Sequence, residues 1–360
     1  MYRSIIKSTR QGIFLAVLVV SLTATQDSFA ADDLAQRSAR SPEEVAEALA
    51  KNYGHSMRQV SYIPALALWG RLRLAELKGG DDEQAVIADV KSITAASPVP
   101  KKWNSGSVIA GHLIYGAIDD RDRLLSAAAW GLDDAGQARD FFPGHSDMSD
   151  SVFMHGPVLA TAYRMSGDAV YLEACLAHYA FMKKLCRRDD GLYRHSPLDE
   201  AAWGRGNGFP ALGLALVLSE LKAADAKEAT ELKGDLLVHL RALKKHQDAD
   251  GMWHQVIDHP ESYAEFSCTC MIGFAMLRGM REGWLDRREF EESADRAWSA
   301  IKKRIHLDGK FLEGVCTGTG KQTSLQAYFD RKEIHGRDDR GGAMALMFST
   351  ERMMWEKTKP

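Results

Sequence analysis

This 360-residue chain has little net charge and few cysteines, and both facts limit the classes of protein to which it can belong. Neither sign of charge dominates, because 46 Lys and Arg stand against 49 Asp and Glu for a net charge of −3. A nucleic-acid partner is not expected, since binding one needs a basic surface. Cysteine is also scarce, with five in the chain. At this length the core, rather than disulfides, should provide stability, and an odd number of cysteines leaves at least one thiol free.

Long apolar runs are confined to the first thirty residues. Three basic residues in the first ten positions precede a short apolar segment over 13–22, which is too short to span a bilayer comfortably. Ser28-Phe29-Ala30 fits a small-x-small cleavage site. We therefore predict a signal peptide over 1–30 and an exported protein, either periplasmic or secreted. No later stretch is apolar and long enough to predict a membrane span.

Strand-like alternation is scarce, and apolar residues recur at three- and four-residue spacing along most of the chain. Residues 31–41 are polar and predict a disordered leader, followed by one domain over 42–360. Pro, Gly and Asp clusters separate most of the periodic segments. The twelve predicted helices cover 43–53, 59–77, 82–96, 107–118, 121–138, 150–166, 168–187, 207–224, 227–247, 264–282, 287–305 and 340–357.

A weak internal repeat supports this division. Asp190-Gly191-Leu192 recurs as Asp250-Gly251-Met252 and as Asp308-Gly309-Lys310, and each copy follows a predicted helix. A period of about 60 residues predicts about six units, each of two helices and a turn-rich connection. The even-numbered helices are apolar and the odd-numbered ones are highly charged, which indicates a buried inner ring and a solvated outer ring. We predict an all-α (α/α)6 barrel, with an open solenoid as the alternative.

In such a barrel the N-terminal ends of the inner helices meet at one mouth. The residues before these helices are rich in aromatic, His, Arg and carboxylate side chains, a composition typical of a carbohydrate cleft. No metal is expected, because Cys268-Thr269-Cys270 is more simply explained as two small buried residues near a helix start. The candidates at these helix starts are His112, Asp147, Asp150, His195, Trp203, Arg205, Asn207, Glu265, Ser267 and His335.

The segment Trp203-Gly204-Arg205-Gly206-Asn207-Gly208 is the most informative motif. Glycine permits positive φ and the close approach of a ligand. Arg offers a planar fork of donors that suits a carboxylate, and the neighbouring aromatic side chain is able to stack on a sugar. The motif lies where a loop becomes a helix, and a helix N-terminus also favours an anion. The alternative is a glycine-rich turn with a solvated Arg.

The candidate acids have structural alternatives. Asp150 opens a predicted helix, where Asp is a favoured N-cap, and Asp147 has the same ambiguity. Glu265 starts another inner helix, where a structural pair with Arg205 is an alternative to binding substrate. For His195 the alternative is a loop histidine whose hydrogen bonds are satisfied within the protein.

Several of these motifs, in the same order, resemble the unsaturated glucuronyl and rhamnogalacturonyl hydrolases of glycoside hydrolase families 88 and 105. The resemblance covers most of the chain after residue 30. It rests on the Trp203–Gly208 segment, Asp150-Ser151-Val152-Phe153-Met154, Leu192-Tyr193-Arg194-His195, Gly251-Met252-Trp253-His254, Tyr263-Ala264-Glu265-Phe266-Ser267, Val315-Cys316-Thr317-Gly318 and His335-Gly336.

The resemblance implies an (α/α)6 barrel, no cofactor, and an oligosaccharide substrate that ends in a 4,5-unsaturated uronic acid, with the unsaturated rhamnogalacturonyl type favoured. Such enzymes hydrate the C4=C5 vinyl ether. By resemblance Asp150 is the acid, Arg205 holds the substrate, and Trp203 shapes the pocket. The resemblance also assigns substrate contacts to His195, Asn207, Glu265, Ser267 and His335.

One position departs from the family pattern. The family commonly carries a second Asp at the start of the fourth helix, and here the corresponding residue is Gly106. Altered substrate choice, compensation by Asp147 or His112, and lost activity all remain open. Two other functions are therefore kept: a glycosidase acting on a saturated uronide, which needs two facing carboxylates, and a sugar-binding homologue without turnover.

Overall fold

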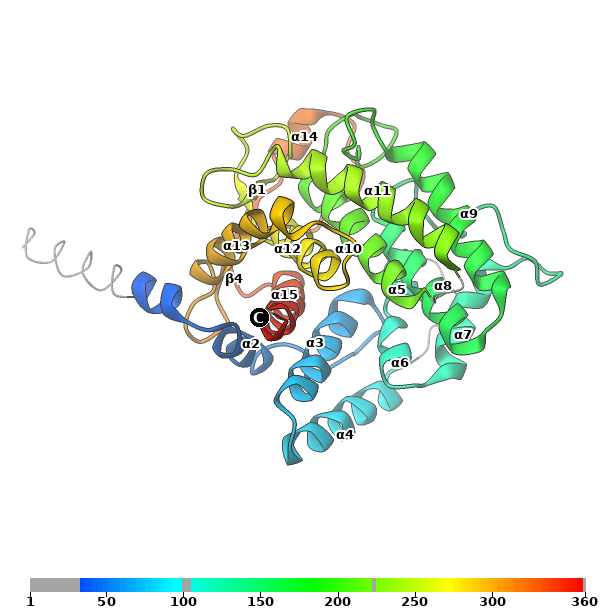
Figure 1. Cartoon of the computed structure of the whole chain (residues 1–360), viewed down its shortest axis with the longest axis horizontal. Coiled ribbons are helices and arrows are strands. Elements are labelled where there is room, and N and C mark those ends of the chain that lie inside the picture. The colour runs from blue at the N-terminus through cyan, green and yellow to red at the C-terminus, as the bar shows by residue number, and fades with distance from the viewer. Residues whose placement is uncertain (1–32, 99–104, 222–224, 359–360) are drawn as a thin grey trace, which may run out of the picture.

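The computed structural model describes residues 33–98, 105–221 and 225–358; the predicted signal peptide lies outside these ranges. Six inner helical segments form a closed ring, because each contacts the next and the last contacts the first (Figure 1). This closure confirms the (α/α)6 barrel and excludes the open solenoid. The inner segments are α3 (Tyr62–Lys78), α5 (Gly106–Ala110) with α6 (Leu113–Ala117), α8 (Ser151–Ser166), α10 (Gly204–Glu220), α12 (Phe266–Arg281) and α15 (Asp339–Lys357).

Six outer helices pack against the inner ring, each beside an inner helix near it in sequence. They are α2 (Pro42–Ala50), α4 (Asp81–Ala96), α7 (Arg121–Ala128), α9 (Ala169–Cys186), α11 (Ala226–Lys244) and α13 (Arg287–Lys303). The inner helix α10 is buried on every side from Gly204 to Leu218, whereas α13 buries one face. The predicted contrast between inner and outer helices is confirmed.

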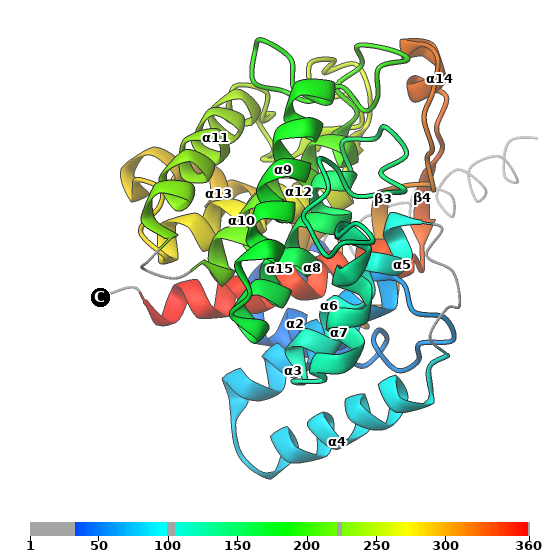
Figure 2. The ribbon, with the colours of Figure 1, turned by 90° about the vertical axis from the view of Figure 1, so that its right-hand side faces the viewer.

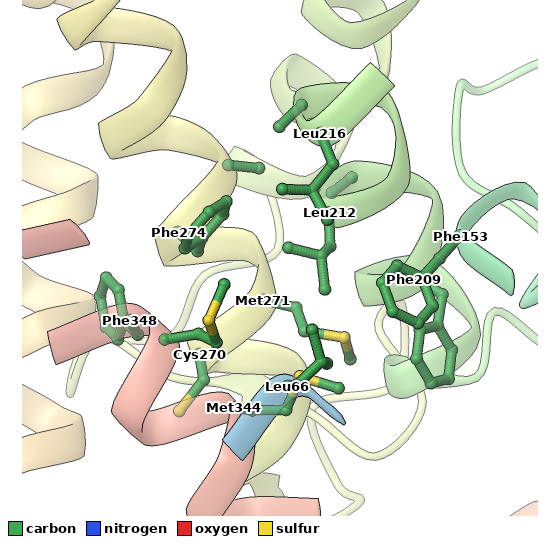
Figure 3. Packing of buried hydrophobic residues seen from close by; sticks show 14 of the residues in the cluster. Leu66, Phe153, Phe209, Leu212, Leu216, Cys270, Met271, Phe274, Met344 and Phe348 are labelled. Atoms are coloured by element: carbon green, nitrogen blue, oxygen red, sulfur yellow. The ribbon is translucent and has the colours of Figure 1, made fainter. Parts of the chain in front are cut away.

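The barrel axis is filled by apolar side chains from several inner helices. Figure 3 shows Leu212 of α10, Met271 and Phe274 of α12, and Met344 and Phe348 of α15 in this core. The core therefore closes the barrel centre, and polar side chains collect at the ends of the helices. In Figure 2, α5 and the two strands β3 (Leu312–Cys316) and β4 (Glu333–Gly336) lie on the side opposite to the C-terminus of α15.

Two predicted helices are shorter or broken. The fourth is split into α5 and α6 at Gly111, where a Cβ atom would lie 2.5 Å from the backbone nitrogen of Ser61. The fifth ends at Ala128 and is followed by the 3₁₀ turn η1 (Ala129–Gly131). Close contact with another segment, which sequence periodicity does not report, ends the helix at Gly111.

The Asp-Gly repeat is confirmed as a structural repeat. Gly191, Gly251 and Gly309 have φ values of +89°, +94° and +71°, a region that disfavours other residues. Each turn packs on an outer helix: a Cβ at Gly251 would lie 2.5 Å from the carbonyl oxygen of Arg296 in α13. At Gly309 it would lie 2.3 Å from the backbone of Ala48 in α2.

The prediction of a disordered leader is wrong for its described part. Residues 33–39 are helical. Arg37 donates to the carbonyl oxygen of Lys303 (3.1 Å), and Arg40 donates to those of Lys302 (2.9 Å) and His306 (3.2 Å). The carbonyls of Lys302 and Lys303 lie in the last turn of α13, where backbone oxygens have no partner within the helix. The polar leader is therefore ordered because its arginines cap that helix.

Two small antiparallel pairs complete the fold: β1 (Trp253–His254) with β2 (Ala264–Glu265), and β3 with β4. The short helix α14 (Leu325–Phe329) lies between β3 and β4. All five cysteines are buried and free, as the expectation of a core-stabilised chain requires. Among the described residues, no helix combines the length and apolarity that crossing a membrane needs.

Candidate active site

Asp150 precedes α8 but does not cap it. Its backbone is helical, with φ −49° and ψ −29°, and its side chain makes no capping hydrogen bond. The residue is 8% exposed, and its Oδ2 atom is buried without a hydrogen-bond partner. Since buried carboxylates are usually hydrogen-bonded, this one is an exception that calls for a functional explanation. The Asp150 carboxylate therefore does not act as the N-cap of α8.

His195 lies directly against this carboxylate. Its Nε2 atom is 3.2 Å from Asp150 Oδ2, without the alignment of a hydrogen bond, and has no other partner. The backbone holds this pair together, because Ser149 donates its N–H to the carbonyl oxygen of His195 (2.9 Å). The buried His195 imidazole and the buried Asp150 carboxylate thus face each other, and each has a polar atom without a hydrogen-bond partner.

Tyr328 in α14 fixes the orientation of His195, and sequence analysis missed it. Its Oη lies 2.9 Å from His195 Nδ1 and accepts the N–H of Gln322 (3.3 Å). Burial raises the pKa of Tyr328 to about 12, so the hydroxyl keeps its proton at neutral pH. A Tyr328 hydroxyl that donates to Nδ1 leaves the proton of a neutral imidazole on Nε2, which faces Asp150.

Arg205 is held in the first turn of α10, almost fully buried. Its guanidinium donates to the carbonyl oxygens of Cys316 (2.9 Å) and Thr317 (2.7 Å) and lies 5.0 Å from the Trp203 ring centroid. Burial opposes its charge, but nearby groups that include Glu265 and Asp150 outweigh this and raise the pKa of Arg205. The site therefore holds a permanent cation near the Asp150 carboxylate.

The glycines around Arg205 serve a different purpose from the one predicted. None of Gly204, Gly206 and Gly208 has positive φ. A Cβ atom would lie 2.6 Å from the carbonyl oxygen of His254 at Gly204, and 2.6 Å from the Met271 side chain at Gly208. At Gly206 it would lie 3.0 Å from Ser149 Oγ. These glycines bring α10 close to other protein segments, and the motif forms the helix itself rather than the loop before it.

Glu265 and Ser267 support Arg205 from behind. Glu265 is fully buried and accepts hydrogen bonds from the N–H groups of Ser267, Cys268 and Cys316 (3.0, 2.6 and 2.9 Å). Ser267 Oγ donates to Glu265 and lies 3.3 Å from Arg205 Nη1, from which it accepts. Glu265 thus caps α12 and anchors β3. These hydrogen bonds support the structural alternative for Glu265, and contact of either residue with substrate stays a prediction.

Asn207 and His112 also make contacts within the protein. The Asn207 amide donates to the carbonyl oxygens of Tyr193 (2.8 Å) and Trp203 (2.9 Å), and its oxygen accepts the N–H of Tyr193 (2.8 Å). This buried side chain therefore shapes the loop that carries His195. His112 is buried, with Nδ1 2.9 Å from the carbonyl oxygen of Val108 and its ring against Tyr115. Compensation by His112 for the missing acid stays a prediction.

Three other candidates lie differently from what was expected. Trp203 is 1% exposed and packs against His195 and Tyr328, so it shapes the site from within and presents no open stacking surface. Asp147 is half-exposed and pairs with His145 (3.2 Å) and Lys321 (3.6 Å). His335 is exposed in β4, 3.2 Å from Glu333, and no contact joins it to Asp150.

Gly106 leaves no room for the second acid of the family pattern. A Cβ atom there would lie 2.8 Å from Met154 Cβ and 3.0 Å from His155 Cε1. His155 is fixed by a buried relay: Phe142 N–H donates to His178 Nδ1 (3.1 Å), and Ser151 Oγ lies 3.1 Å from His178 Nε2 and 2.7 Å from His155 Nδ1. The imidazole of His155 and the side chain of Met154 therefore occupy the space that the Cβ atom of an acid at 106 would need.

Tyr62 was also missed by sequence analysis. It opens α3, is 9% exposed, and packs against Phe153 and Phe209. Burial raises the pKa of its hydroxyl, which lies in the electrostatic fields of Arg205 and Asp150. Its position at an inner-helix start was a usable signal, but the apolar residues that follow it favoured a core role.

Comparison with known families decides the class. The model of Glycosyl Hydrolase Family 88 matches residues 126–356. The chain belongs to this family. Its matched region includes every residue of the Asp150, His195, Arg205 and Glu265 arrangement, so the family 88 membership and the site geometry concern the same part of the chain.

Curated relatives of this family 88 chain include two named hydrolases. The unsaturated 3S-rhamnoglycuronyl hydrolase of Formosa agariphila is 30% identical over 179 residues, which are 45% of this chain and 47% of that protein. The unsaturated rhamnogalacturonyl hydrolase YesR of Bacillus subtilis is 30% identical over 157 residues, 43% of this chain and 42% of YesR. The matched chain spans about half the length of these relatives.

Solved structures show the same fold. A possible member of the GH105 family from Salmonella enterica has a TM-score of 0.73 at 20% identity, covering 87% of this chain and 93% of that one. A family 88 glycosyl hydrolase from Bacteroides vulgatus has a TM-score of 0.68 at 18% identity, covering 88% of this chain and 100% of that one. At these identities the likeness establishes the architecture.

Proposed function

We propose that this family 88 protein removes a 4,5-unsaturated uronic acid from the non-reducing end of oligosaccharides that polysaccharide lyases release. The observation that carries the proposal is the buried, unpartnered Oδ2 of Asp150, 3.2 Å from His195 Nε2. The names of both curated relatives support an unsaturated uronyl substrate, and the name of YesR supports the unsaturated rhamnogalacturonyl type. The predicted signal peptide supports export to the periplasm or the medium.

In the proposed reaction Asp150, as a carboxylic acid, donates its proton to C4 of the vinyl ether. Positive charge then develops at C5 and the ring oxygen. The Asp150 carboxylate accepts a proton from water as that water bonds to C5, so the acid is restored. The product is a hemiketal, which opens and expels the remaining sugar chain. One water molecule is consumed overall, and no cofactor is needed.

The other residues of the site bind and orient. Arg205 is proposed to hold the uronate carboxylate, because a guanidinium binds such a group through two parallel hydrogen bonds. His195 is proposed to donate from Nε2, either to Asp150 as a carboxylate or to a sugar hydroxyl. Trp203 keeps Arg205 and His195 in position, since it packs against both.

The alternative of a saturated glycosidase has less support in this geometry. That reaction needs a second carboxylate facing Asp150 across the sugar. Glu265 is occupied by backbone N–H groups, and Asp147 is paired with His145 and Lys321. Glu265 is therefore engaged elsewhere, and Asp147 lies in a half-exposed cluster with His145 and Lys321.

The test is loss of the conjugated ultraviolet absorbance of lyase-generated oligosaccharides from pectin, ulvan and glycosaminoglycans. We expect turnover by the wild-type protein and a fall of at least about 10³-fold in kcat for Asp150→Asn, the upper part of the range for a lost general acid. Turnover by Asp150→Asn at the wild-type rate would contradict the proposal. Hydrolysis of saturated uronides alone would support the glycosidase, and tight binding without turnover would support the sugar-binding homologue.

A further inference from the structure

A groove of about 670 Å³ opens at the mouth of the barrel. Three inner helices contribute to it through their N-terminal ends. The loop before α3 supplies Arg58 and Ser61, α5 supplies Ser107, and the start of α15 supplies Arg337 and Asp339. A sugar chain is the kind of ligand that such a polar, open groove fits.

The groove lies next to Asp150 and Arg205. Residues that line the groove alternate along the chain with residues that face the Asp150 and Arg205 side. Ser61 and Ile63 line the groove, and the Tyr62 ring between them packs against Phe153 and Phe209, which follow Asp150 and Arg205 by about one helical turn. At α15, Asp338 lies between the groove residues Arg337 and Asp339, and the field of Arg205 reaches it. When the terminal sugar of an oligosaccharide is bound at Asp150, the next sugar therefore lies beside the groove.

The groove carries one guanidinium that nothing in the described parts of the chain neutralises. Arg337 is held by Asp339 (3.2 Å) and by the carbonyl oxygen of Asn52 (3.1 Å), and it lies 5.5 Å from the Tyr53 ring centroid. Arg58 is exposed, and among residues 33–98, 105–221 and 225–358 no carboxylate lies within 4.0 Å of it. An unneutralised cation in a sugar groove favours an anionic ligand group.

We propose that this groove binds the sugar that follows the uronate, and that Arg58 recognises an anionic substituent on that sugar, a sulfate ester or a carboxylate. This inference rests on the proposed function and adds the class of aglycone. A guanidinium forms paired, charge-assisted hydrogen bonds with either group. Since Arg58 is exposed and outside the Asp150 and Arg205 arrangement, it affects substrate choice rather than the chemical step.

Three unsaturated disaccharides that share the same uronate test this proposal. The second sugar carries a sulfate ester, a carboxylate or neither charge, and kcat and KM are measured separately for each. For Arg58→Gln we expect KM to rise about three- to tenfold with the anionic substrate, with kcat unchanged and less than a twofold change with the neutral one. The two anionic substrates show which substituent the groove prefers.

Arg121→Gln is the matched control, because Arg121 is an exposed arginine on the outer helix α7. It should leave all three KM values unchanged. A contact between charges also weakens with salt, so the preference of the wild-type protein for the anionic substrate should fall as ionic strength rises. An equal effect of Arg58→Gln on all three substrates, or no effect on any, overturns the proposal.

Binding separates this inference from the proposed function. Calorimetry with the Asp150→Asn protein measures the affinity for each disaccharide without turnover. Tighter binding of the anionic disaccharides that depends on Arg58, together with no turnover by the wild-type protein, supports the groove and overturns the proposed hydrolase. Turnover without any dependence on the anionic substituent supports the hydrolase and overturns the role of Arg58.

Discussion

Asp150 Oδ2 and His195 Nε2 lie 3.2 Å apart in a buried space, and neither atom has a hydrogen bond in the described structure. Two polar atoms that stay unpaired away from water cost free energy. Ser149, the residue before Asp150, donates its backbone N–H to the carbonyl oxygen of His195. The Tyr328 hydroxyl contacts Nδ1, the other ring nitrogen of His195. The protein thus keeps both atoms in place for a third partner, which we assign to the substrate.

The orientation of His195 should depend on Tyr328. Tyr328→Phe keeps the aromatic ring but removes the hydroxyl that lies 2.9 Å from His195 Nδ1. We expect kcat to fall about tenfold and the free energy of unfolding to fall by about 1 kcal/mol, the usual contribution of one hydrogen bond. Steady-state kinetics and urea unfolding measure the two effects. An unchanged kcat would show that the hydroxyl does not position the imidazole.

Arg205 should not be replaceable by lysine. A single ammonium group on a flexible stem lacks the planar fork that reaches the carbonyl oxygens of Cys316 and Thr317. Arg205→Lys should therefore lower kcat/KM about 10²-fold and cost about 1–3 kcal/mol of stability, because a buried carbonyl loses its partner. Arg241→Lys, at an exposed pair with Glu289, is the control and should change stability by less than about 0.5 kcal/mol.

A side chain at position 106 should destabilise the protein. Gly106→Ala and Gly106→Asp place a Cβ atom 2.8 Å from Met154 Cβ, which requires α5 or α8 to shift and should cost about 1–3 kcal/mol. Gly234→Ala in α11 meets no atom within 4 Å and should stabilise by about 0.5–1 kcal/mol. Thermal unfolding compares the three variants. A Gly106→Asp protein as stable as the wild type would show that the family's second acid fits here.

Stability should fall with acid below pH 6.5. Burial lowers the pKa of His112 and of His178 from 6.5 to about 4, so the unfolded chain binds protons that the folded protein does not. The stabilisation from each neutral imidazole is complete above pH 6.5 and is lost as pH falls towards 4. We expect a loss of about 2 kcal/mol per histidine at pH 5, since one pKa unit corresponds to about 1.4 kcal/mol.

Urea unfolding at pH 7 and pH 5 measures this dependence. His178→Gln removes one of the buried histidines whose pKa is lowered, so the difference between the two pH values should shrink even where the variant is less stable overall. A pH difference that stays the same in this variant would show that His178 is not the group responsible.

The local pattern of the sequence determined the architecture. Helical periodicity and the apolar or charged character of each helix depend on residues within a few helical turns, and the Asp-Gly repeat recurs about every 60 residues. Together these patterns predicted the (α/α)6 barrel. Composition at the inner-helix starts also placed Asp150, His195 and Arg205 at one mouth, since the topology brings those ends together.

Tertiary structure alone decided which polar groups remain available. Glu265 is engaged by the N–H of Cys316 and Asn207 by the backbone of Tyr193, whereas Asp150 keeps an unpaired oxygen. Tyr328 reaches His195 across 133 positions of sequence. Hydrogen-bond partners come from segments that are distant along the chain, and the close contacts at Gly106 and Gly208 depend on how neighbouring helices pack. No short-range pattern records these partners, so they become visible only in the folded chain.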